Sequence, residues 1–368
     1  MINLSTRQIL HACITVLIGT LLGAAAVEFG LRYYTRYVQS QEQMTPGLLV
    51  YDPQLGWRMA ANWQGRHVHF DFDVRYSTND QGLRGANWPR PTTSGSERIA
   101  VLGDSFTFGL GVNDDETFVQ LLNAGGSGAT YLNTGIAGYS TDQQLLYLKD
   151  RLATWQVDQL VLVVYLANDL LDNRLRFPLQ AEMGKPLFLT GPAGLQLINV
   201  PVPTAPKPPE ERARTLGTEV LGRELPDTWR NQWQITRSLG LAESADAELL
   251  AGMAGRLAEP VDLFVQLVAA IRSLCAANNV GLRLVLMPGR SHVEMPSSLS
   301  AAFQDELRRQ IIARHEDLGT PPIDLASRLR ERFAATGERL FFPNEGHLNP
   351  AGHRAVAELL RKVLDDQA

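Results

Sequence analysis

The sequence predicts an α/β domain in which helices cover both faces of a parallel sheet. From Arg98 onward, apolar runs of strand length alternate with longer amphipathic runs. The strand runs are apolar throughout, which is typical of strands that are buried on both faces. A sheet of such strands has to be covered by helices on each side, so the alternation indicates a parallel sheet with helical connections.

Five strands and five helices are expected in this part of the chain. We place the strands at Ile99–Leu102, Thr130–Leu132, Leu160–Tyr165, Leu282–Met287 and Pro322–Leu325. We place the helices at Asp115–Asn123, Thr141–Thr154, Pro260–Asn278, Leu299–His315 and Pro350–Leu364.

The alternation is interrupted at residues 174–259, where we predict an insertion. Nine of the chain's 20 prolines lie between Pro178 and Pro226, and such a run is not compatible with a core strand or helix. We expect loops and one helix around Asp227–Ser238. Its Trp229 and Trp233 lie one turn apart, so they either pack the helix onto the sheet domain or form an aromatic wall of a substrate groove.

Residues 46–96 form a second distinct segment, which we predict to be a small β-rich lead-in. It contains Pro, Gly and Asn together with alternating stretches such as residues 67–74, HVHFDFDV. This pattern indicates short strands joined by turns.

The N-terminal segment is long and apolar enough to be a transmembrane helix. Gln8–Val27 contains no Asp, Glu, Lys or Arg, and about 20 such residues span a bilayer. Arginines and tyrosines flank the run, as at a membrane interface. We expect an anchor at residues 8–28, a stalk at 29–45, the lead-in at 46–96 and the main domain at 97–366. The alternatives are a cleaved signal peptide, with Ala24-Ala25-Ala26 as the cleavage site, and a buried helix.

Charge and cysteine content exclude several classes of protein. With 34 Lys+Arg, 39 Asp+Glu, 20% charged and 45% hydrophobic residues, the chain is not a disordered, collagen-like or coiled-coil protein. A net charge of −5 gives no reason to expect nucleic-acid binding. Cys13 and Cys275 alone cannot build a disulfide framework or a Cys-based zinc site, and His347 with His353 lacks a metal-ligand helical spacing. We therefore expect no metal.

The first candidate for chemistry is Gly103-Asp104-Ser105, which follows a buried strand. Open α/β folds bind their ligands at the carboxyl edge of the sheet, so Ser105 is a candidate nucleophile there. Its N–H could also point toward a developing oxyanion. The alternative is a plain strand-to-loop turn. The segment is neither a Gly-x-Ser-x-Gly elbow nor a phosphate-binding loop.

Two further residues follow predicted strands at the same edge. Gly138 follows the second strand, and a glycine lets a backbone N–H approach a ligand closely. Asn168 follows the third strand, where its carboxamide could donate to an oxyanion. In isolation, Asn168 could equally be a helix cap.

The fourth candidate is Glu345-Gly346-His347, on a short loop before the helix that begins at Pro350. A carboxylate two residues from a histidine can hold one imidazole nitrogen while the other faces a hydroxyl, as a general base requires. The alternative is an ordinary surface loop. His353 is expected to be a helix-face or capping histidine.

Taken together, these motifs resemble those of the SGNH hydrolases, also called GDSL-type esterases. The resemblance rests on Ser105 and its preceding Gly-Asp, Gly138, Asn168, the pair Glu345 and His347, and the run Gly82-Leu83-Arg84-Gly85, and it covers about residues 50–366 apart from the insertion. It implies a three-layer α/β/α sandwich with five parallel strands in a flavodoxin-like arrangement.

The resemblance also implies roles for these residues. They are a Ser105–His347–acid triad, an oxyanion hole made by the N–H groups of Ser105 and Gly138 with the Asn168 side chain, and Asp104 as a supporting residue. The usual acid of the family is an aspartate two or three residues before the histidine, whereas this chain has Asn344 and Glu345 there. Because asparagine cannot stabilise an imidazolium by charge, we assign Glu345. A backbone carbonyl could also orient the histidine.

The function implied is a membrane-anchored serine esterase that works without a cofactor. We expect it to remove small acyl groups, such as O-acetyl, from a carbohydrate or cell-envelope substrate on the extracytoplasmic side. The alternatives are an O-acyltransferase in polysaccharide modification and a catalytically silent carbohydrate-binding protein. Acyl transfer to an oligosaccharide, or failure of a fluorophosphonate to label Ser105, would distinguish them.

Overall fold

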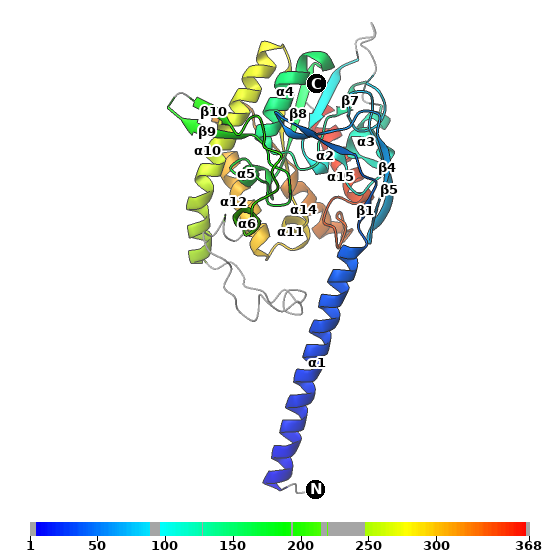
Figure 1. Ribbon diagram of the computed structural model, residues 1–368, viewed down its shortest axis with the longest axis vertical. Coiled ribbons are helices and arrows are strands. Elements are labelled where there is room, and N and C mark those ends of the chain that lie inside the picture. Colours follow the sequence, from blue (N-terminus) through cyan, green and yellow to red (C-terminus); the bar gives the residue numbers. More distant parts are fainter. Residues whose placement is uncertain are drawn as a thin grey trace.

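The computed structural model describes residues 5–88, 96–126, 128–192, 194–214, 219 and 247–365. A long N-terminal helix, α1 (Thr6–Ser40), projects from one end of an α/β domain (Figure 1). Between them in the sequence lies a group of short strands. The active-site candidates all belong to the α/β domain, so its sheet is described first.

The central sheet of the described chain has five parallel strands. They are β6 (Arg98–Leu102), β7 (Thr130–Asn133), β8 (Gln159–Tyr165), β11 (Gly281–Met287) and β12 (Ile323–Asp324), in the spatial order β12-β11-β8-β6-β7. Each overlaps a predicted strand. Numbered along the chain, the strands have the spatial order 2-1-3-4-5. The chain adds β7 on one side of β6 and the later strands on the other side, so the topological switch point lies between β6 and β8. Open α/β sheets bind their ligands at such a point.

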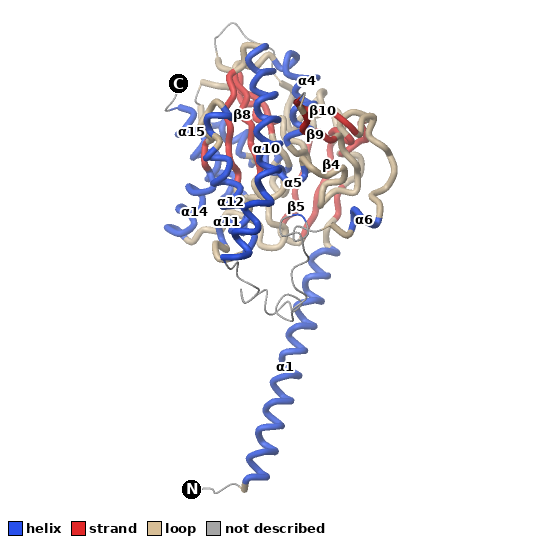
Figure 2. Tube along the Cα trace, turned by 90° about the vertical axis from the view of Figure 1, so that its left-hand side faces the viewer, coloured by secondary structure: helices blue, strands red, loops and turns tan. Residues whose placement is uncertain are grey.

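Alternate residues of each strand enter two separate cores. In β8, Leu160 and Leu162 pack with the helices of one layer, while Val161 and Val163 pack with those of the other. The first layer contains α4 (Thr141–Trp155), α10 (Ala247–Ala277) and α12 (Leu299–Ala313), and the second α3 (Phe118–Ala124), α14 (Leu325–Thr336) and α15 (Pro350–Asp365). Figure 2 shows the strands between α15 and α10. The predicted three-layer α/β/α fold is confirmed.

The lead-in consists of two small antiparallel sheets. One pairs β2 (Leu49–Asp52) with β3 (Gly56–Met59); the other has the order β1 (Gln43–Met44), β4 (Gln64–His69), β5 (Phe72–Ser77). Buried side chains of the lead-in, among them Trp57, Tyr76 and Leu83, share the first core of the α/β domain. The lead-in is therefore packed onto the domain.

Three predicted helices differ in detail from the structure. The helix expected from Pro260 begins at Ala247 and runs through Pro260. Proline is favoured at a helix start and disfavoured in a helix interior, but the turns before Pro260 are held by packing on the sheet domain, as at the buried Leu257. The predicted Leu299–His315 is divided into α12 and α13 (His315–Leu318). The predicted Asp115–Asn123 is divided into a 3-10 turn, Asp114–Glu116, and α3, whose first turn is capped by the Thr117 hydroxyl.

The segment predicted as an insertion contains more structure than loops. After α5 (Asp169–Asp172), β9 (Leu187–Gly191) and β10 (Gly194–Ile198) form an antiparallel hairpin, followed by α6 (Pro209–Arg212). Lys185 forms an ion pair with Asp142 of α4, and both side chains are fully buried. The expected helix at 227–238, with Trp229 and Trp233, lies outside the described residues.

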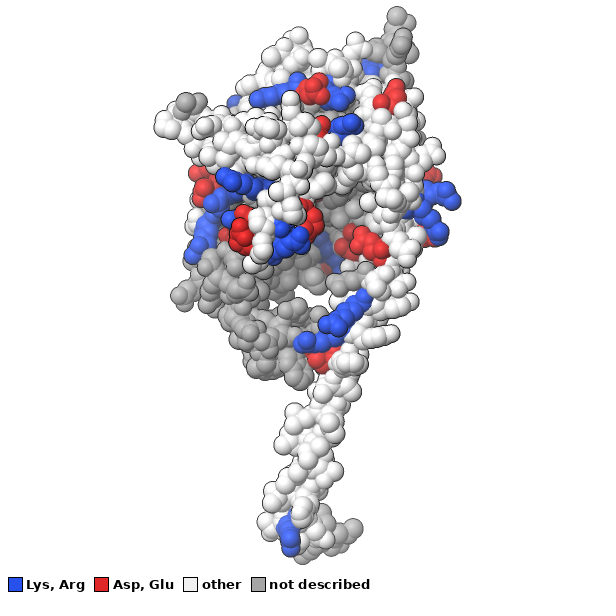
Figure 3. All heavy atoms as spheres, viewed as in Figure 1, with Lys and Arg blue, Asp and Glu red and all other residues white. Residues whose placement is uncertain are grey.

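Two helices of the described chain are long and apolar enough to cross a membrane. In α10 half of the apolar window is buried, because this helix packs on the sheet domain, whereas none of the apolar window of α1 is buried. The charged side chains of α1 lie near its two ends (Figure 3). An exposed apolar N-terminal helix is compatible with a membrane anchor or a signal sequence.

Candidate active site

Ser105 is the first residue of a short helix, α2 (Ser105–Phe108), directly after the central strand β6. The turn needs glycine at position 103, where a Cβ would lie 2.2 Å from the Thr107 hydroxyl. Asp104 is buried, and one of its carboxylate oxygens accepts the Phe106 N–H at 2.9 Å. This hydrogen bond of Asp104 holds the turn that presents Ser105 at the edge of the sheet.

The structure brings His347, with Glu345 beside it, to Ser105, which lies 242 residues before His347 in the sequence. His347 Nε2 lies 2.7 Å from Ser105 Oγ, and its Nδ1 lies 2.5 Å from Glu345 Oε1. Because an ionised carboxylate can only accept, Nδ1 carries the proton and Nε2 accepts the Ser105 hydroxyl. A hydroxyl, an imidazole and a carboxylate linked in this order can act as a nucleophile, a general base and an orienting acid.

The loop that carries His347 is closed by its own backbone. The Phe342 N–H donates to the His347 carbonyl at 2.8 Å, and the Glu345 Oε2 accepts the His347 N–H at 2.9 Å. The imidazole also packs on the Phe106 ring, with 4.6 Å between centroids. These contacts leave the ring little freedom to turn away from Ser105.

At His347 and Glu345, the effect of the neighbouring charge on the pKa is opposite to the effect of burial. Burial alone would lower the His347 pKa, but the charge and hydrogen bond of Glu345, with a contribution from Asp104, raise it above its ordinary value. Burial would raise the pKa of Glu345, and His347 lowers it overall. Burial raises the Asp104 pKa to about 6. Glu345 is therefore the ionised partner of the imidazole at neutral pH.

The expected oxyanion donors lie at the carboxyl ends of three adjacent strands. Ser105 follows β6 in the middle, Gly138 follows β7 on one side and Asn168 follows β8 on the other. Within the described residues, neither the two backbone N–H groups nor the Asn168 carboxamide donates a hydrogen bond. Asn168 occupies the cap position of α5, but its side chain does not cap the helix. Three donors without a protein acceptor at one edge of a sheet are able to bind an oxyanion.

Gly138 is held by a residue that the sequence did not identify, Trp57 of β3. The indole Nε1 donates to the Ala137 carbonyl at 2.9 Å, and the Tyr139 hydroxyl donates back to the Trp57 carbonyl at 2.5 Å. Gly138 itself has φ +80°, a left-handed conformation that favours glycine. The lead-in therefore fixes the orientation of the Gly138 N–H.

Asp71, in the turn between β4 and β5, is a second residue that sequence analysis missed. Its carboxylate accepts the Asn344 N–H at 2.8 Å, the Asn344 Nδ2 at 2.7 Å and the Glu345 N–H at 2.9 Å. The side chain is only 5% exposed. Asp71 and the loop that it holds are 273 residues apart in sequence, so no local pattern could have revealed the contact.

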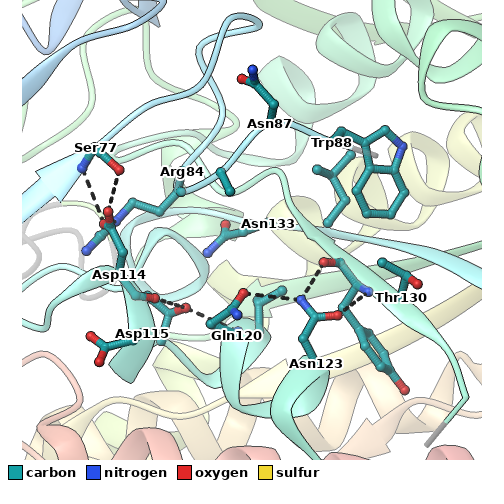
Figure 4. Close-up of a pocket in the computed structure, with 16 residues that line it drawn as sticks. Ser77, Arg84, Asn87, Trp88, Asp114, Asp115, Gln120, Asn123, Thr130 and Asn133 are labelled. Atoms are coloured by element: carbon teal, nitrogen blue, oxygen red, sulfur yellow. Dashed lines mark hydrogen bonds and ion pairs between the residues drawn. The ribbon is translucent and has the colours of Figure 1, made fainter. Parts of the chain in front are cut away.

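Arg84, from the run noted in the sequence, acts on the segment after Ser105. Its guanidinium donates to the carbonyls of Phe108, Gly109 and Val112 and pairs with Asp114. Arg84 lines a cavity of about 440 Å³, together with Ser77 and Asp114. The Ser77 N–H donates a hydrogen bond to the Asp114 carboxylate there (Figure 4). Ser105, Glu345 and His347 do not line this cavity. Because its guanidinium holds three carbonyls, Arg84 positions the segment that follows Ser105.

The remaining histidine near the C-terminus has a structural role. His353 is fully buried in α15, and its Nδ1 accepts the Phe118 N–H at 3.1 Å at the start of α3. Burial lowers its pKa to about 3. Among the described residues, no group of His, Cys, Asp or Glu side chains is arranged to hold a metal ion.

Comparisons with known proteins identify the family to which the chain belongs. Residues 101–355 match the family model of the GDSL-like lipase/acylhydrolase family, whereas no curated protein matches the chain. Similar solved structures include an acetyl xylan esterase (14% identity, TM-score 0.40, 73% of this chain and 99% of the other). Also similar is a lipase/acylhydrolase from Enterococcus faecalis, with 13% identity and a TM-score of 0.38 over 74% of this chain and 96% of the other. A third is a member of the lipolytic protein G-D-S-L family from Veillonella parvula, with 13% identity and a TM-score of 0.36 over 73% of this chain and 97% of the other.

The matched residues begin in β6 and end in α15, so they include the segments that carry Ser105, Gly138, Asn168, Glu345 and His347. They make up more than half of the chain. The protein belongs to the GDSL-like lipase/acylhydrolase family and is an ester-bond hydrolase.

Proposed function

We propose that the protein is a serine esterase that removes a small acyl group, such as O-acetyl, from a carbohydrate or other cell-envelope substrate through an acyl-serine intermediate. The observation that carries the proposal is the continuous hydrogen-bond relay from Ser105 Oγ through His347 to Glu345. The nucleophile of such a relay is activated without a metal or organic cofactor.

In the proposed mechanism, His347 Nε2 takes the Ser105 proton as Ser105 Oγ attacks the ester carbonyl carbon. The N–H groups of Ser105 and Gly138 and the Asn168 carboxamide donate to the tetrahedral oxyanion. Glu345 stabilises the imidazolium that forms. His347 then gives its proton to the leaving alcohol oxygen as the C–O bond breaks, which leaves the acyl group on Ser105.

A water molecule completes the reaction. His347 takes a proton from the water as its oxygen attacks the acyl carbon, and the same donors stabilise the second tetrahedral oxyanion. Return of the proton to Ser105 Oγ releases the carboxylic acid and restores the starting state.

We further propose that α1 is retained as a membrane anchor and that the catalytic domain lies on the extracytoplasmic side. Three observations support the anchor: the exposed apolar length of α1, the tyrosines of α1 that follow the apolar run, and the absence of charge between Gln8 and Val27. An anchored esterase of this kind would act on envelope material close to the membrane.

The test is hydrolysis of a short-chain nitrophenyl ester by Ser105→Ala. We expect turnover to fall by about 1000-fold or more, because no other group of the relay can form the acyl-enzyme. Ser273→Ala, an exposed serine on α10 whose hydroxyl bonds only its own helix, is the matched control and should keep full activity. Unchanged turnover in Ser105→Ala would refute the assignment. Release of free acid, rather than transfer of the acyl group to an added oligosaccharide, would exclude the acyltransferase alternative.

A further inference from the structure

Three aromatic rings lie against one another at the catalytic edge of the sheet. The Phe106 ring contacts the imidazole of His347, with 4.6 Å between centroids and 35° between ring planes. It also stacks on Tyr165, with 4.0 Å between centroids and 26° between ring planes. Phe106 comes from α2, Tyr165 ends β8, and His347 lies on the loop before α15. The imidazole therefore rests on a ring that is itself stacked on a second ring.

The Phe106 ring is held by the same turn that presents Ser105. Its side chain is buried in the second core, where Val163 and Leu348 also lie. The Phe106 N–H donates to the Asp104 carboxylate at 2.9 Å, and the residue between them is Ser105. One short helix therefore places both the serine hydroxyl and the surface on which its imidazole partner rests.

Tyr165 is fixed at its backbone and at its hydroxyl end. Its N–H donates to the Asp169 carboxylate at 2.9 Å. A Cβ on Gly289, directly before α11 (Arg290–Glu294), would lie 2.8 Å from the Tyr165 hydroxyl oxygen. Burial raises the pKa of this phenol, and the nearby carboxylates raise it further, so Tyr165 is neutral at physiological pH. Tyr165 therefore gives the Phe106 ring a fixed, uncharged surface to pack on.

The contact between Phe106 and His347 depends on the charge of the imidazole. The face of an aromatic ring is electron-rich and attracts a cation within about 6 Å of its centroid, a range that includes the 4.6 Å separation here. In the proposed mechanism His347 becomes an imidazolium only when it takes the Ser105 proton. The attraction therefore grows as the tetrahedral intermediate forms, and an interaction that grows in this way accelerates the reaction.

The charged groups around His347 leave the face of the imidazole to this ring. Burial lowers the His347 pKa, whereas Glu345 and Asp104 raise it. His353 interacts with the same imidazole, but burial lowers its own pKa to about 3, so it is uncharged at neutral pH. The two imidazole nitrogens are occupied in the ring plane by Glu345 and the serine hydroxyl. Contact with Phe106 therefore adds to these hydrogen bonds without competing with them.

We infer that Phe106 is a positioning residue of the proposed esterase, whose ring holds the His347 imidazole toward Ser105 and stabilises the imidazolium that forms. The inference rests on the proposed function. The name of the matched family spells Gly-Asp-Ser-Leu, whereas this chain has phenylalanine in the fourth place. The aromatic ring is thus a feature of this chain, and leucine is a natural replacement for it at this turn.

The test is the pH dependence of kcat and kcat/KM for the short-chain nitrophenyl ester, measured on the full-length wild type and on Phe106→Leu. The matched control is Phe118→Leu. Phe118 is buried in the same core and stacks on His353, with 5.9 Å between centroids, and that histidine has no part in the proposed reaction. Urea unfolding of each variant measures what the loss of a ring does to stability alone.

We expect Phe106→Leu to lower kcat by about 2- to 30-fold, which corresponds to about 0.5–2 kcal/mol of cation–π attraction. The base works only when His347 is neutral, so activity is lost as the pH falls through its pKa. Because the variant loses a contact that favours the imidazolium, that pKa falls, and the acidic limb of kcat/KM moves to lower pH by about 0.3–1.5 pH units. Phe118→Leu should keep the wild-type kcat and limb even where its stability falls.

Each other outcome has a definite meaning. A wild-type kcat and limb in Phe106→Leu overturn the inference, and so does an equal change in Phe118→Leu. If Phe106→Leu does not fold, Tyr165→Phe, which keeps the stack, should retain the wild-type kcat, and Tyr165→Leu should lower it by about twofold or more. Equal rates in these two variants overturn the inference. All these results leave the proposed esterase activity standing, whereas a wild type without turnover refutes the proposed function itself.

Discussion

Replacement of Glu345 with Gln is the sharpest test of the triad. Glu345 bonds His347 twice, through Nδ1 and through the backbone N–H. The substitution keeps the size of the side chain but removes its charge. Because Glu345 is the main group that raises the His347 pKa against burial, the variant should show both a slower reaction and a shifted pH profile.

The expected loss of rate follows from the hydrogen bond to the imidazolium. A charge-assisted hydrogen bond contributes about 1.5–3 kcal/mol, and about 1.4 kcal/mol corresponds to a tenfold change in rate. We therefore expect kcat to fall by roughly 10- to 150-fold. The base works only when His347 is neutral, so activity is lost as the pH falls through its pKa. In the variant burial lowers that pKa, and the acidic limb of kcat/KM moves to lower pH.

The assay is the pH dependence of kcat/KM for a soluble acetate ester, measured for the wild type and for Glu345→Gln. The matched control is the double variant with Asn344→Asp, which supplies a carboxylate at the neighbouring position. Since Asn344 bonds Asp71 rather than the imidazole, the double variant should be no faster than the single one. A wild-type rate and limb in Glu345→Gln, or rescue by Asn344→Asp, would refute the reasoning.

Three further predictions concern the groups around the triad. Asp71→Asn removes the charge that holds the acid loop, and we expect kcat to fall about tenfold in a folded protein; an unchanged kcat would contradict this. Gly138→Ala places a Cβ 3.2 Å from the Trp57 ring at φ +80°, so both kcat and stability should fall, the latter by about 1–2 kcal/mol in urea unfolding. Lys185→Met leaves the buried Asp142 charge unpaired; its free energy of unfolding should fall by about 3–5 kcal/mol, with part of the loss recovered when Asp142→Leu is added.

The strands and the parts of the site that follow them could be predicted because burial on both faces leaves a continuous apolar run, as in Leu160–Tyr165. The carboxyl ends of such strands meet at one edge, which is why Ser105 and Asn168 could be placed together. The start of α10 could not be predicted, because packing of the helix on the sheet outweighs the local preference of Pro260 for a helix start.

The contacts of the lead-in could not be predicted for a different reason. Trp57 is an aromatic residue of a short strand and Asp71 a residue of a short turn, and nothing in the local sequence distinguishes either from its neighbours. Their roles arise only when the lead-in docks on the domain. Trp57 then contacts Ala137, which is 80 residues away in the sequence, and Asp71 contacts Asn344, which is 273 residues away. Burial and register within one segment carry no information about a partner at that separation.

This docking also gives a physical reason why Glu345, and not residue 344, is the acid of the proposed triad. The backbone turns so that Asn344 faces Asp71, with both its N–H and its Nδ2 donating to that carboxylate. An aspartate at 344 would place a second negative charge against Asp71, at a cost that an amide avoids. The residue whose side chain turns toward the imidazole is Glu345, and its own N–H is fixed by the same Asp71. Asp71 therefore favours an amide at position 344 and holds the backbone of Glu345. We expect a substitution at Asp71 to be compensated more readily by a substitution at Asn344 than by one at Glu345.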